Sequence, residues 1–533
     1  MGKSLVLAEK PSVGRELAKI LNCNQKGNGC LIGSKYIVTW ALGHLVTLAD
    51  PEKYNDKYKT WNMEDLPMLP ERMKLVVIPK TAKQFGAVKT LMKRQDIDEI
   101  IIATDAGREG ELVARWIIAK AEVRKPIKRL WISSQTERAI KDGFNNLKPC
   151  KEYENLCSSA ECRAEADWLV GLNVTRALTC KYNAQLSAGR VQTPTLAMIV
   201  ERENEIRSFV PKDYWNIDVL TKDFFLRWQD KKNGQIRISN KDKADKIIAA
   251  ITGQTAQIIE VKKEAKKELP PLAYDLTELQ RDANRKYGFS AKTTSSVMQQ
   301  LYEHHKLVSY PRTDSRYITE DIVPTLRERL KSISVGSYAE LVRTVLKGKI
   351  STTKRLVDNS KVTDHHAIIP TEQFVNLSRL SSEEMKVYDL IVKRFIAVLS
   401  PAFEYEKTTI KAEIKGEIFT AGGKIVKQNG WKNVYHGKED SEGWEEEKDD
   451  KEQEQTFTEI KKGEKLQVVS VKSVVGKTKP PARYNEATLL SAMEHPGKLV
   501  ENQSLRESIN NTNGLGTPAT RADIIEKLFN SFY

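Results

Sequence analysis

The chain has 533 residues, which is too long for one hydrophobic core and predicts several domains. Hydrophobic residues make up 40% of it and nine are Trp, so the composition excludes a wholly disordered chain. Lys and Arg outnumber Asp and Glu by 86 to 71, and the net charge of +15 is compatible with a polyanionic partner without identifying one.

Targeting and cysteine signals narrow the class of protein. No apolar run approaches the roughly 18 residues that a membrane span needs, and the first residues lack the long apolar stretch of a signal peptide. We therefore expect a soluble cytoplasmic protein that does not bind membranes. The six Cys form no CxxC pair, which argues against a disulfide framework or a zinc ribbon and predicts buried free thiols.

The charge is uneven along the chain. Residues 439–454 hold ten acids and two Lys, a net charge of −8, which leaves +23 on the other residues. The simpler interpretation of this segment is a solvated acidic loop. The alternative is a segment that mimics nucleic acid and lies over a basic groove.

Residues 1–150 alternate apolar strands with amphipathic helices, the pattern of a parallel sheet covered on both faces. Residues 4–8 form the first expected strand, and Ser12 is the expected cap of the helix that follows. Residues 97–104 form a second strand, which a turn joins to a helix with Leu112 and Trp116 on its apolar face.

Carboxylates follow both strands. Glu9 comes after the first, and Asp105 and Glu109 come after the second. Ligands of open α/β sheets bind at the carboxyl ends of the strands, so the three carboxylates are expected to share one cleft, suited to Mg²⁺. Taken alone, a DxxxE pattern at a strand end is more often a helix cap or a surface salt bridge.

The rest of the chain changes character several times. Residues 151–207 are helical, strand-like alternation begins at 214, and strands return near 405–470. Residues 276–305 read as two helices with a break at 287–290, which fits a helix-turn-helix or a plain αα-hairpin. Helices are expected again at 485–495 and 519–530.

Two short segments carry further reactive side chains. In SYPRTDS (309–315), Tyr310 has a hydroxyl that needs activation because its ordinary pKa is near 10, and Arg312 provides a fixed charge that can grip a phosphate. In DHHAIIPT (364–371), no Cys or acidic spacing completes a zinc site around His365 and His366, so a hydrogen bond to phosphate is the alternative. Packing roles are the default for an isolated Tyr or His.

Together these segments resemble the type IA DNA topoisomerases, and the resemblance covers essentially the whole chain. AEKPSV at the first strand is the form found in the topoisomerase III branch. The matching segments, in the family's order, are LAEKPSV (7–13), GH (43–44), TDAGREGE (104–111), RAEADWLVGLNVTRALT (163–179), SAGRVQTPTL (187–196), SYPRTDS, DHHAIIPT, PARYNEATLL (481–490) and GLGTPATRADII (514–525).

The resemblance implies a multidomain α/β plus α+β protein whose four domains form a toroid. A Toprim domain, which is a Rossmann-like fold, would occupy 1–150. The other domains would be a helical DNA-groove domain at 151–215 and 465–533, a β-rich arch at 216–275 and 400–464, and a catabolite-activator-like domain at 276–399 that carries Tyr310. The acidic segment would project from the arch.

The implied reaction is an ATP-independent transesterification, and the chain indeed has no GxxxxGK[ST] phosphate loop. Tyr310 would attack a phosphodiester of one DNA strand, form a 5′-phosphotyrosine, let another strand pass and reseal the break, so that DNA is relaxed or decatenated. By the same resemblance, Glu9 would be the general acid, while Lys10, Arg312 and His365 would hold the phosphate or assist proton transfer.

Binding roles follow from the same motifs. Glu9, Asp105 and Glu109 would bind Mg²⁺, with Glu111 as an uncertain fourth ligand; the family's DxDxE has lost its middle carboxylate at Gly107, so we expect one ion, used mainly for resealing and relaxation. The residues expected along the single-strand groove are Arg163, Asp167, Arg176, Ser187, Arg190, Gln192, Thr520 and Arg521.

Two other classes of protein remain open. Toprim sheets also occur in primases and metal-dependent nucleases, and a truncated core could bind or cleave single-stranded DNA without relaxing it. The sequence stops inside an amphipathic segment, so we expect a chain that has been cut short. For the topoisomerase we expect a monomer at the bacterial nucleoid, acting on single-stranded and negatively supercoiled DNA with a helicase and a single-strand-binding protein as partners.

Overall fold

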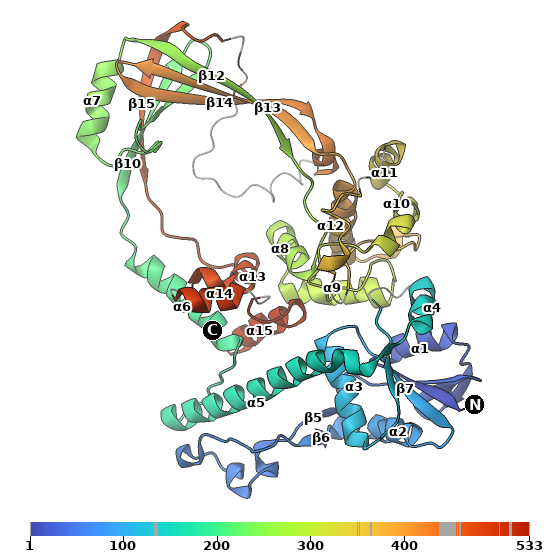
Figure 1. The fold of residues 1–533 in the computed structure, drawn as a ribbon. Helices are drawn as coiled ribbons and strands as arrows, with labels where there is room; N and C mark the ends of the chain where they lie inside the picture. Colours follow the sequence, from blue (N-terminus) through green and yellow to red (C-terminus); the bar gives the residue numbers. More distant parts are fainter. Residues whose placement is uncertain are drawn as a thin grey trace.

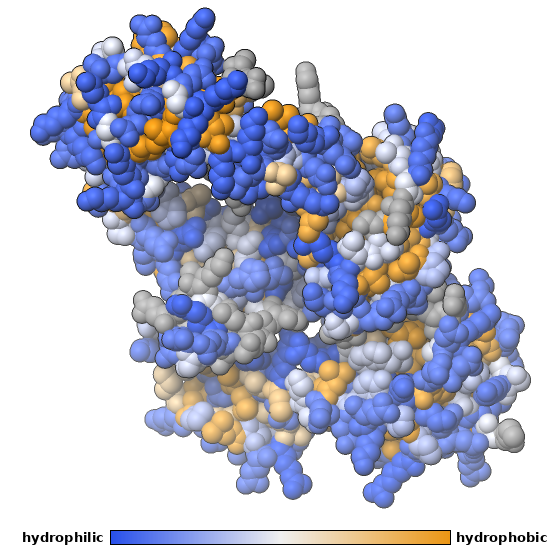
Figure 2. Space-filling view, turned by 45° about the horizontal axis from the view of Figure 1, so that its top comes forward, coloured by the Kyte–Doolittle hydropathy of each residue, from blue (hydrophilic) through white to orange (hydrophobic). Residues whose placement is uncertain are grey.

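The chain folds into a ring of linked units around a central opening (Figure 1). The computed structural model describes residues 2–132, 137–348, 350, 352–362, 365–435, 455, 457, 460–499, 502–510 and 514–531. The acidic segment 439–454 lies outside the described residues. Hydrophilic residues cover most of the face seen in Figure 2, and hydrophobic residues form scattered groups on it.

The N-terminal unit is a seven-stranded sheet in the order β2-β3-β4-β1-β7-β8-β9, with β4, β1, β7 and β8 parallel. Its strands are β1 (Lys3–Ala8), β2 (Gln25–Gly27), β3 (Cys30–Ile32), β4 (Tyr36–Trp40), β7 (Ile97–Ala103), β8 (Ile127–Arg129) and β9 (Lys148–Pro149), beside a separate pair β5 (Val46–Leu48) and β6 (Leu75–Val77). Both faces of the sheet are covered, as the sequence predicts.

Alternation along β1 explains the two layers of helices. Leu5 and Leu7 face a core shared with α2 (Ala82–Met92) and α3 (Arg108–Ala121), whereas Val6 and Ala8 face α1 (Pro11–Ile20) and α4 (Glu137–Asn145). Because both sets are buried, β1 is apolar throughout, as in other parallel sheets.

The start of α1 corrects one prediction. Lys10 rather than Ser12 is the N-cap residue, and no side chain caps this helix. Pro11 occupies the first helical position, where its fixed φ suits the helix and its missing N–H costs nothing. Ser12 therefore lies inside the helix.

A helical part follows the sheet. The 29-residue α5 (Glu154–Tyr182) leads to α6 (Gln192–Ser208), and three C-terminal helices join them: α13 (Glu486–Glu494), α14 (Gln503–Asn510) and α15 (Pro518–Asn530). Met198 of α6 packs in one small core with Leu490 and Met493 of α13 and Ile525 of α15. Segments almost 300 residues apart in the chain therefore build one part of the ring.

The far side of the ring is a closed β-barrel (Figure 1). Its strands run in the order β10-β11-β14-β13-β12-β15, and α7 (Lys241–Ile251) packs on it. The strands are β10 (Asp213–Thr221), β11 (Phe225–Gln229), β12 (Thr255–Glu268), β13 (Phe403–Ile414), β14 (Glu417–Gln428) and β15 (Lys465–Lys477).

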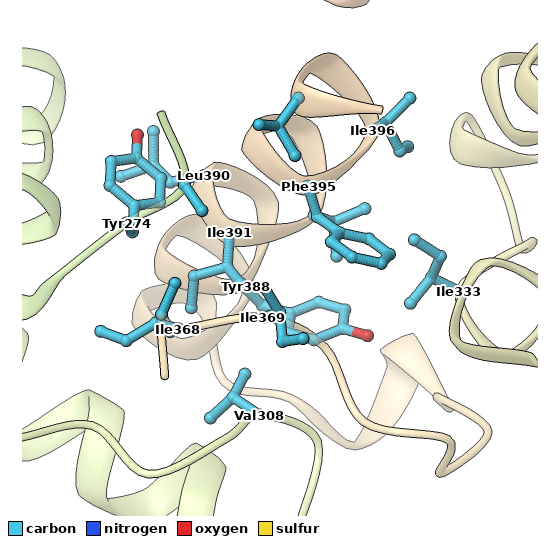
Figure 3. Packing of buried hydrophobic residues seen from close by; sticks show 14 of the residues in the cluster. Tyr274, Val308, Ile333, Ile368, Ile369, Tyr388, Leu390, Ile391, Phe395 and Ile396 are labelled. Carbon is cyan, nitrogen blue, oxygen red and sulfur yellow. The ribbon is translucent and has the colours of Figure 1, made fainter. Parts of the chain in front are cut away.

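The remaining unit carries the tyrosine segment. It contains α8 (Leu276–Tyr287), α9 (Ala291–Glu303), α10 (Leu326–Ser332), α11 (Tyr338–Lys347) and α12 (Ser382–Val398). Its core gathers Tyr388, Ile391 and Phe395 of α12 with Val308 and Ile368 (Figure 3). Val308 directly precedes the tyrosine segment, so this packing anchors that segment.

Short 3-10 helices complete the described secondary structure at Pro51–Lys53, Asp56–Lys59, Met63–Asp65, Pro79–Thr81, Cys150–Tyr153, Glu320–Thr325, Asn359–Lys361, Leu377–Arg379, Gly430–Tyr435 and Pro496–Leu499.

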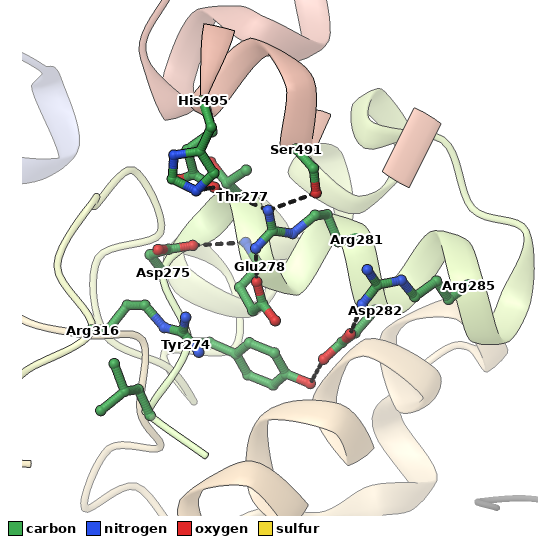
Figure 4. A network of polar contacts seen from close by, with 12 residues as sticks. Tyr274, Asp275, Thr277, Glu278, Arg281, Asp282, Arg285, Arg316, Ser491 and His495 are labelled. Atoms are coloured by element: carbon green, nitrogen blue, oxygen red, sulfur yellow. Dashed lines mark hydrogen bonds and ion pairs between the residues drawn. The ribbon is translucent and has the colours of Figure 1, made fainter. Parts of the chain in front are cut away.

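Polar contacts join α8 to the C-terminal helices (Figure 4). Arg281 donates to Ser491 Oγ at 2.9 Å and to Glu494 Oε2 at 3.0 Å. Arg521 Nη1 of α15 donates to Thr277 Oγ1 at 2.9 Å. The unit that carries the tyrosine segment therefore contacts the C-terminal helices as well as the N-terminal sheet unit.

Two further predictions meet the structure here. Cys23, Cys30, Cys150 and Cys157 are buried free thiols as predicted, but Cys162 is exposed and Cys180 is half-buried, because both lie along the open face of α5. Among the residues that the structure describes, no helix has the length and apolarity to span a membrane. The domain boundaries given above stay a prediction.

Candidate active site

Tyr310 meets the carboxylates of the sheet at the junction of two units. Its hydroxyl donates to Asp105 Oδ2 at 2.8 Å, although 205 residues separate the two side chains in the chain. The His365 ring lies against the Tyr310 ring, with centroids 4.1 Å apart, and the Tyr302 ring of α9 meets it edge-on at 5.4 Å. The sequence-predicted Tyr310, Asp105 and His365 are thus brought together.

Hydrogen bonds hold the tyrosine segment in place. Ser309 N donates to Ile369 O at 2.9 Å, and Ile369 N donates to Ser309 Oγ at 3.0 Å. Three residues beyond Tyr310, Thr313 Oγ1 donates to the carbonyl of His365 at 2.8 Å. These bonds fix the two motifs side by side, so His365 and Tyr310 are positioned as one piece.

Glu9 lies beside Asp105. The Asp105 N–H donates to Glu9 Oε2 at 3.2 Å. Burial, followed by the negative charge of Asp105, raises the pKa of Glu9 to about 7, and the cations Lys10 and Arg312 oppose this change. A carboxyl with this pKa holds a proton for much of the time at neutral pH.

The environment also keeps the Tyr310 hydroxyl protonated. Burial, followed by the charge of Asp105 and the hydrogen bond to it, raises the pKa of Tyr310 well above its ordinary value of 10, and Arg312 acts in the opposite direction. The phenol therefore needs a base at the moment of attack. Asp105 is the group that accepts its hydrogen bond.

Glu109 is not grouped with Glu9 and Asp105 in a set that could hold a metal ion. Its carboxylate is 57% exposed, and Arg163 Nη1 and His44 Nε2 lie 3.4 Å and 3.9 Å from its two oxygens. Within the described part of the chain, no three His, Cys, Asp or Glu side chains are grouped closely enough to hold a metal ion. The predicted third ligand thus belongs to a neighbouring ion pair in this structure.

Glu111, the uncertain fourth ligand, is fully buried and does not face the site. Arg129 Nε donates to Glu111 Oε2 at 3.0 Å, and Arg115 Nε donates to Glu111 Oε1 at 2.8 Å. Its charge is already balanced by two guanidinium groups.

The predicted cations line the junction. Lys10 Nζ lies 4.0 Å from Glu303 Oε1 of α9, and Arg312 is exposed. A second pair, Lys306 with Glu16 at 2.7 Å, crosses the same junction. A cavity of about 480 Å³ lies between the units, with Lys10, Asp105, Tyr310 and His365 among its lining residues.

His366 differs from its neighbour. It is buried, and its Nδ1 lies 2.7 Å from the carbonyl oxygen of Ala367. Burial lowers the pKa of His366 to about 4, so the ring is neutral at physiological pH. A structural role fits His366, whereas His365 contacts the tyrosine.

A second cavity, of about 680 Å³, runs along α5 and is lined by Glu109, Arg163, Asp167 and Ser187. Arg190 Nη1 donates to Asp167 Oδ1 at 2.9 Å, and the buried Gln192 donates to Ser187 Oγ at 3.1 Å. The structure therefore gathers five of the eight predicted groove residues, Arg163, Asp167, Ser187, Arg190 and Gln192, around this cavity and its rim.

Three predicted groove residues have protein partners instead. Arg176 donates to the Tyr58 carbonyl at 2.9 Å and covers the Trp61 ring. The Thr520 hydroxyl accepts from Thr517 N at 2.9 Å and so caps α15. Arg521 is only 1% exposed and ties α15 to α8, so its guanidinium does not face the groove in this conformation.

The sequence patterns give no role to His44, which stands in the matching segment GH (43–44). In the structure His44 lies beside Glu109 and lines the cavity along α5. A signal was available: the segment follows β4, which is the parallel neighbour of β1, and side chains there reach the same edge as Glu9.

Comparisons with known proteins agree with this geometry. A family model described as DNA topoisomerase matches residues 151–533, and a Toprim domain model matches residues 4–135. The chain is 59% identical over 534 residues to DNA topoisomerase 3 of Bacillus subtilis, and the alignment covers 100% of this chain and 73% of that protein. DNA topoisomerase 3 of Bacillus licheniformis is 58% identical over the same length, with the same coverage.

A solved structure shares the fold. Full-length topoisomerase I from Thermotoga maritima superposes with a TM-score of 0.69 and 24% sequence identity, over 99% of this chain and 78% of that one. The similarity bears out the expected multidomain α/β plus α+β toroid.

Proposed function

Because the chain belongs to the DNA topoisomerase family and is a type IA, topoisomerase III-like enzyme, we propose that Tyr310 is its nucleophile. The observation that carries the proposal is the 2.8 Å hydrogen bond from the Tyr310 hydroxyl to Asp105 across the junction of two units. The nucleophile lies on one unit and its acid–base partners lie on the other. The site can therefore open when the two units separate.

The chemical step follows from these contacts. The Tyr310 oxygen attacks the phosphorus of one DNA strand while its proton passes to Asp105, and the bond from phosphorus to the 3′-oxygen breaks. Glu9, with a pKa of about 7, gives its proton to the departing 3′-oxygen. Reversal of both proton transfers reseals the strand, so the phosphodiester energy is kept and ATP is not consumed.

Three further residues support this step. Lys10 lines the cavity that contains Tyr310, and Arg312 follows Tyr310 by two residues, so we assign both cations to the phosphate. The His365 ring lies against the Tyr310 ring at an interplanar angle of 31°, and we assign His365 to the same phosphate or its neighbour. Since all three flank the nucleophile, each contributes by positioning and by electrostatic stabilisation.

Mg²⁺ fits two of its three predicted ligands. Glu9 and Asp105 lie side by side, and the charge of Asp105 raises the pKa of Glu9, so a cation between them would relieve their repulsion. Glu109 would become a third ligand if its carboxylate left its contacts with Arg163 and His44. Mg²⁺ binds one or two carboxylates and keeps several waters, and when bound it would hold the phosphate for resealing. We therefore propose a single ion.

The groove along α5 is proposed as the path of single-stranded DNA. Arg163 and Arg190 lie beside Asp167 there, and neutralisation of phosphates by such residues makes affinity fall steeply with salt. The ring is built by one chain and supplies both halves of the site, so we propose a monomer that relaxes negative supercoils and decatenates DNA. The proposed setting is the bacterial nucleoid, where a helicase and a single-strand-binding protein would expose the strand.

Plasmid relaxation with Tyr310→Phe tests this proposal. The substitution removes one hydroxyl, so relaxation should disappear while binding to a single-stranded oligonucleotide changes less than about 2-fold. Tyr317→Phe is the matched control, because its hydroxyl contacts Lys361 at 3.3 Å, away from the junction. DNA cleavage that survives Tyr310→Phe would instead indicate a metal-dependent nuclease.

A further inference from the structure

Resting on the function proposed above, we propose that Arg129 is a positioning residue of the reaction, which fixes the peptide of Asp105 so that its carboxylate and N–H reach Tyr310 and Glu9. Arg129 is the last residue of β8, and its side chain is 0% exposed. No motif recognised in the sequence includes it.

The Arg129 guanidinium is bonded to the strand that ends at the site. Its Nη2 donates to the Asp105 carbonyl at 2.6 Å, and its Nη1 donates to the Thr104 carbonyl at 2.8 Å. Nη1 also reaches the carbonyls of Leu130 at 2.8 Å and Ile102 at 3.3 Å. One side chain thus holds the end of β7 and the turn that follows it.

Asp105 transmits this hold to the reacting groups. Its carbonyl faces Arg129, its N–H faces Glu9 at 3.2 Å, and its carboxylate faces Tyr310 at 2.8 Å. A rotation of the Asp105 backbone would disturb both of the latter contacts together. Displacements of about 1 Å in such a site can cost about 10²-fold in rate.

A contribution to folding stability explains a buried arginine at position 129 less well than a positioning role does. A buried guanidinium carries a desolvation penalty of several kcal/mol, and an apolar residue of similar volume is often as stable at such a position. The charge of Arg129 is balanced by Glu111, but Arg115 also pairs with Glu111. Unlike Arg115, Arg129 also donates hydrogen bonds to the backbone carbonyls of the turn.

Arg129 influences the reaction by positioning Asp105 rather than through its own charge. The charge of Arg129 is paired with Glu111, and its other hydrogen bonds go to backbone carbonyls. In the described part of the structure, no hydrogen bond or ion pair joins Arg129 to Glu9 or Tyr310. Its influence on the chemistry therefore depends on where it holds Asp105.

The test compares Arg129→Lys with Arg115→Lys. Lysine keeps the charge at position 129 and can still pair with Glu111, but it cannot reach four carbonyls at once. Arg115 is the matched control, because it shares Glu111 but its other bond goes to the Cys150 carbonyl at 2.8 Å. Each full-length protein is assayed for covalent adduct formation on a single-stranded oligonucleotide in a single turnover, for oligonucleotide affinity and for thermal stability.

Arg129→Lys should form the adduct about 10²-fold more slowly, with oligonucleotide affinity within about 2-fold of wild type. Arg115→Lys should stay within about 3-fold in rate. If Arg129→Lys cleaves at the wild-type rate, or if Arg115→Lys loses as much rate at equal stability, the positioning role is refuted.

A second variant covers the case in which Arg129→Lys does not fold. The pair Arg129→Met with Glu111→Gln removes both buried charges, and the same loss of rate at unchanged affinity is expected from a folded sample. A folded double variant that cleaves normally overturns the inference. Absence of an adduct from wild type under the same conditions would refute the proposed function itself, so the two failures are distinguishable.

Discussion

A substitution at Gly110 can displace the turn that carries Asp105, because Gly110 packs directly against the Asp105 backbone. A Cβ atom at this position would lie 2.1 Å from the Asp105 carbonyl oxygen and 3.0 Å from the Asp105 carbonyl carbon and nitrogen. These are backbone atoms, so no side chain can rotate away to make room. A normal contact exceeds 3 Å, so Gly110→Ala must move the Asp105 peptide or the start of α3 by about 1 Å, at a cost of about 1–3 kcal/mol from overpacking.

Because Asp105 bonds to both Tyr310 and Glu9, Gly110→Ala should slow adduct formation by about 10²-fold. The assay is single-turnover cleavage of a labelled oligonucleotide, with thermal melting in parallel. Gly86→Ala in α2 is the matched control: its Cβ would have no neighbour within 4 Å, and alanine should stabilise the helix by up to about 1 kcal/mol. A Gly110→Ala protein that cleaves at the wild-type rate would refute the link between the turn and the chemistry.

Two other substitutions probe the interface and the metal site. Burial, followed by the charge of Glu494, raises the pKa of Asp275 at the start of α8 from 3.8 to about 7. Since the folded pKa is the higher one, the stabilisation is complete below pH 3.8 and is lost as pH rises through 7. Asp275→Asn keeps an oxygen for the cap, so its free energy of unfolding in denaturant titrations should exceed that of wild type by up to about 4 kcal/mol at pH 8 but by less than about 1 kcal/mol at pH 4. An equal difference at both pH values would contradict this assignment. At Gly107 the backbone is extended, with φ −178°, and no side chain caps α3, so Gly107→Asp should fold, add a few tenths of a kcal/mol and tighten Mg²⁺ binding in calorimetric titrations. Two tight Mg²⁺ sites in the wild-type protein would count against the single ion.

Local patterns in the sequence predicted the layers of the fold well. The buried apolar runs of β1 and β7, the two helices around Gly288, and the strands of the barrel all follow from apolar patterns and turn residues. Side-chain contacts between distant segments required the family resemblance. Nothing near Tyr310 in the sequence indicates that its hydroxyl bonds to Asp105, because that contact depends on how two units dock.

The failures of prediction have physical reasons. Ser12 is a good capping residue, but Pro11 before it already fits the first helical position, so α1 starts at Pro11 and its N-cap residue is Lys10. Arg521 lies in a motif expected along the groove, yet its guanidinium donates to the Thr277 hydroxyl and the Leu515 carbonyl and is therefore held in the interface. Glu109 is drawn from the acidic pair by Arg163 on α5, a partner that sequence distance concealed.

The central claim is that Tyr310 becomes covalently linked to a DNA 5′ end. The most direct measurement is to quench cleavage of a single-stranded oligonucleotide with denaturant, digest the protein and identify the modified peptide by mass spectrometry. The account predicts one nucleotide-bearing peptide that contains Tyr310, joined through a 5′-phosphate, with a free 3′-hydroxyl on the other fragment. Cleaved DNA without a linked peptide, or a link to another residue or to a 3′ end, would contradict it.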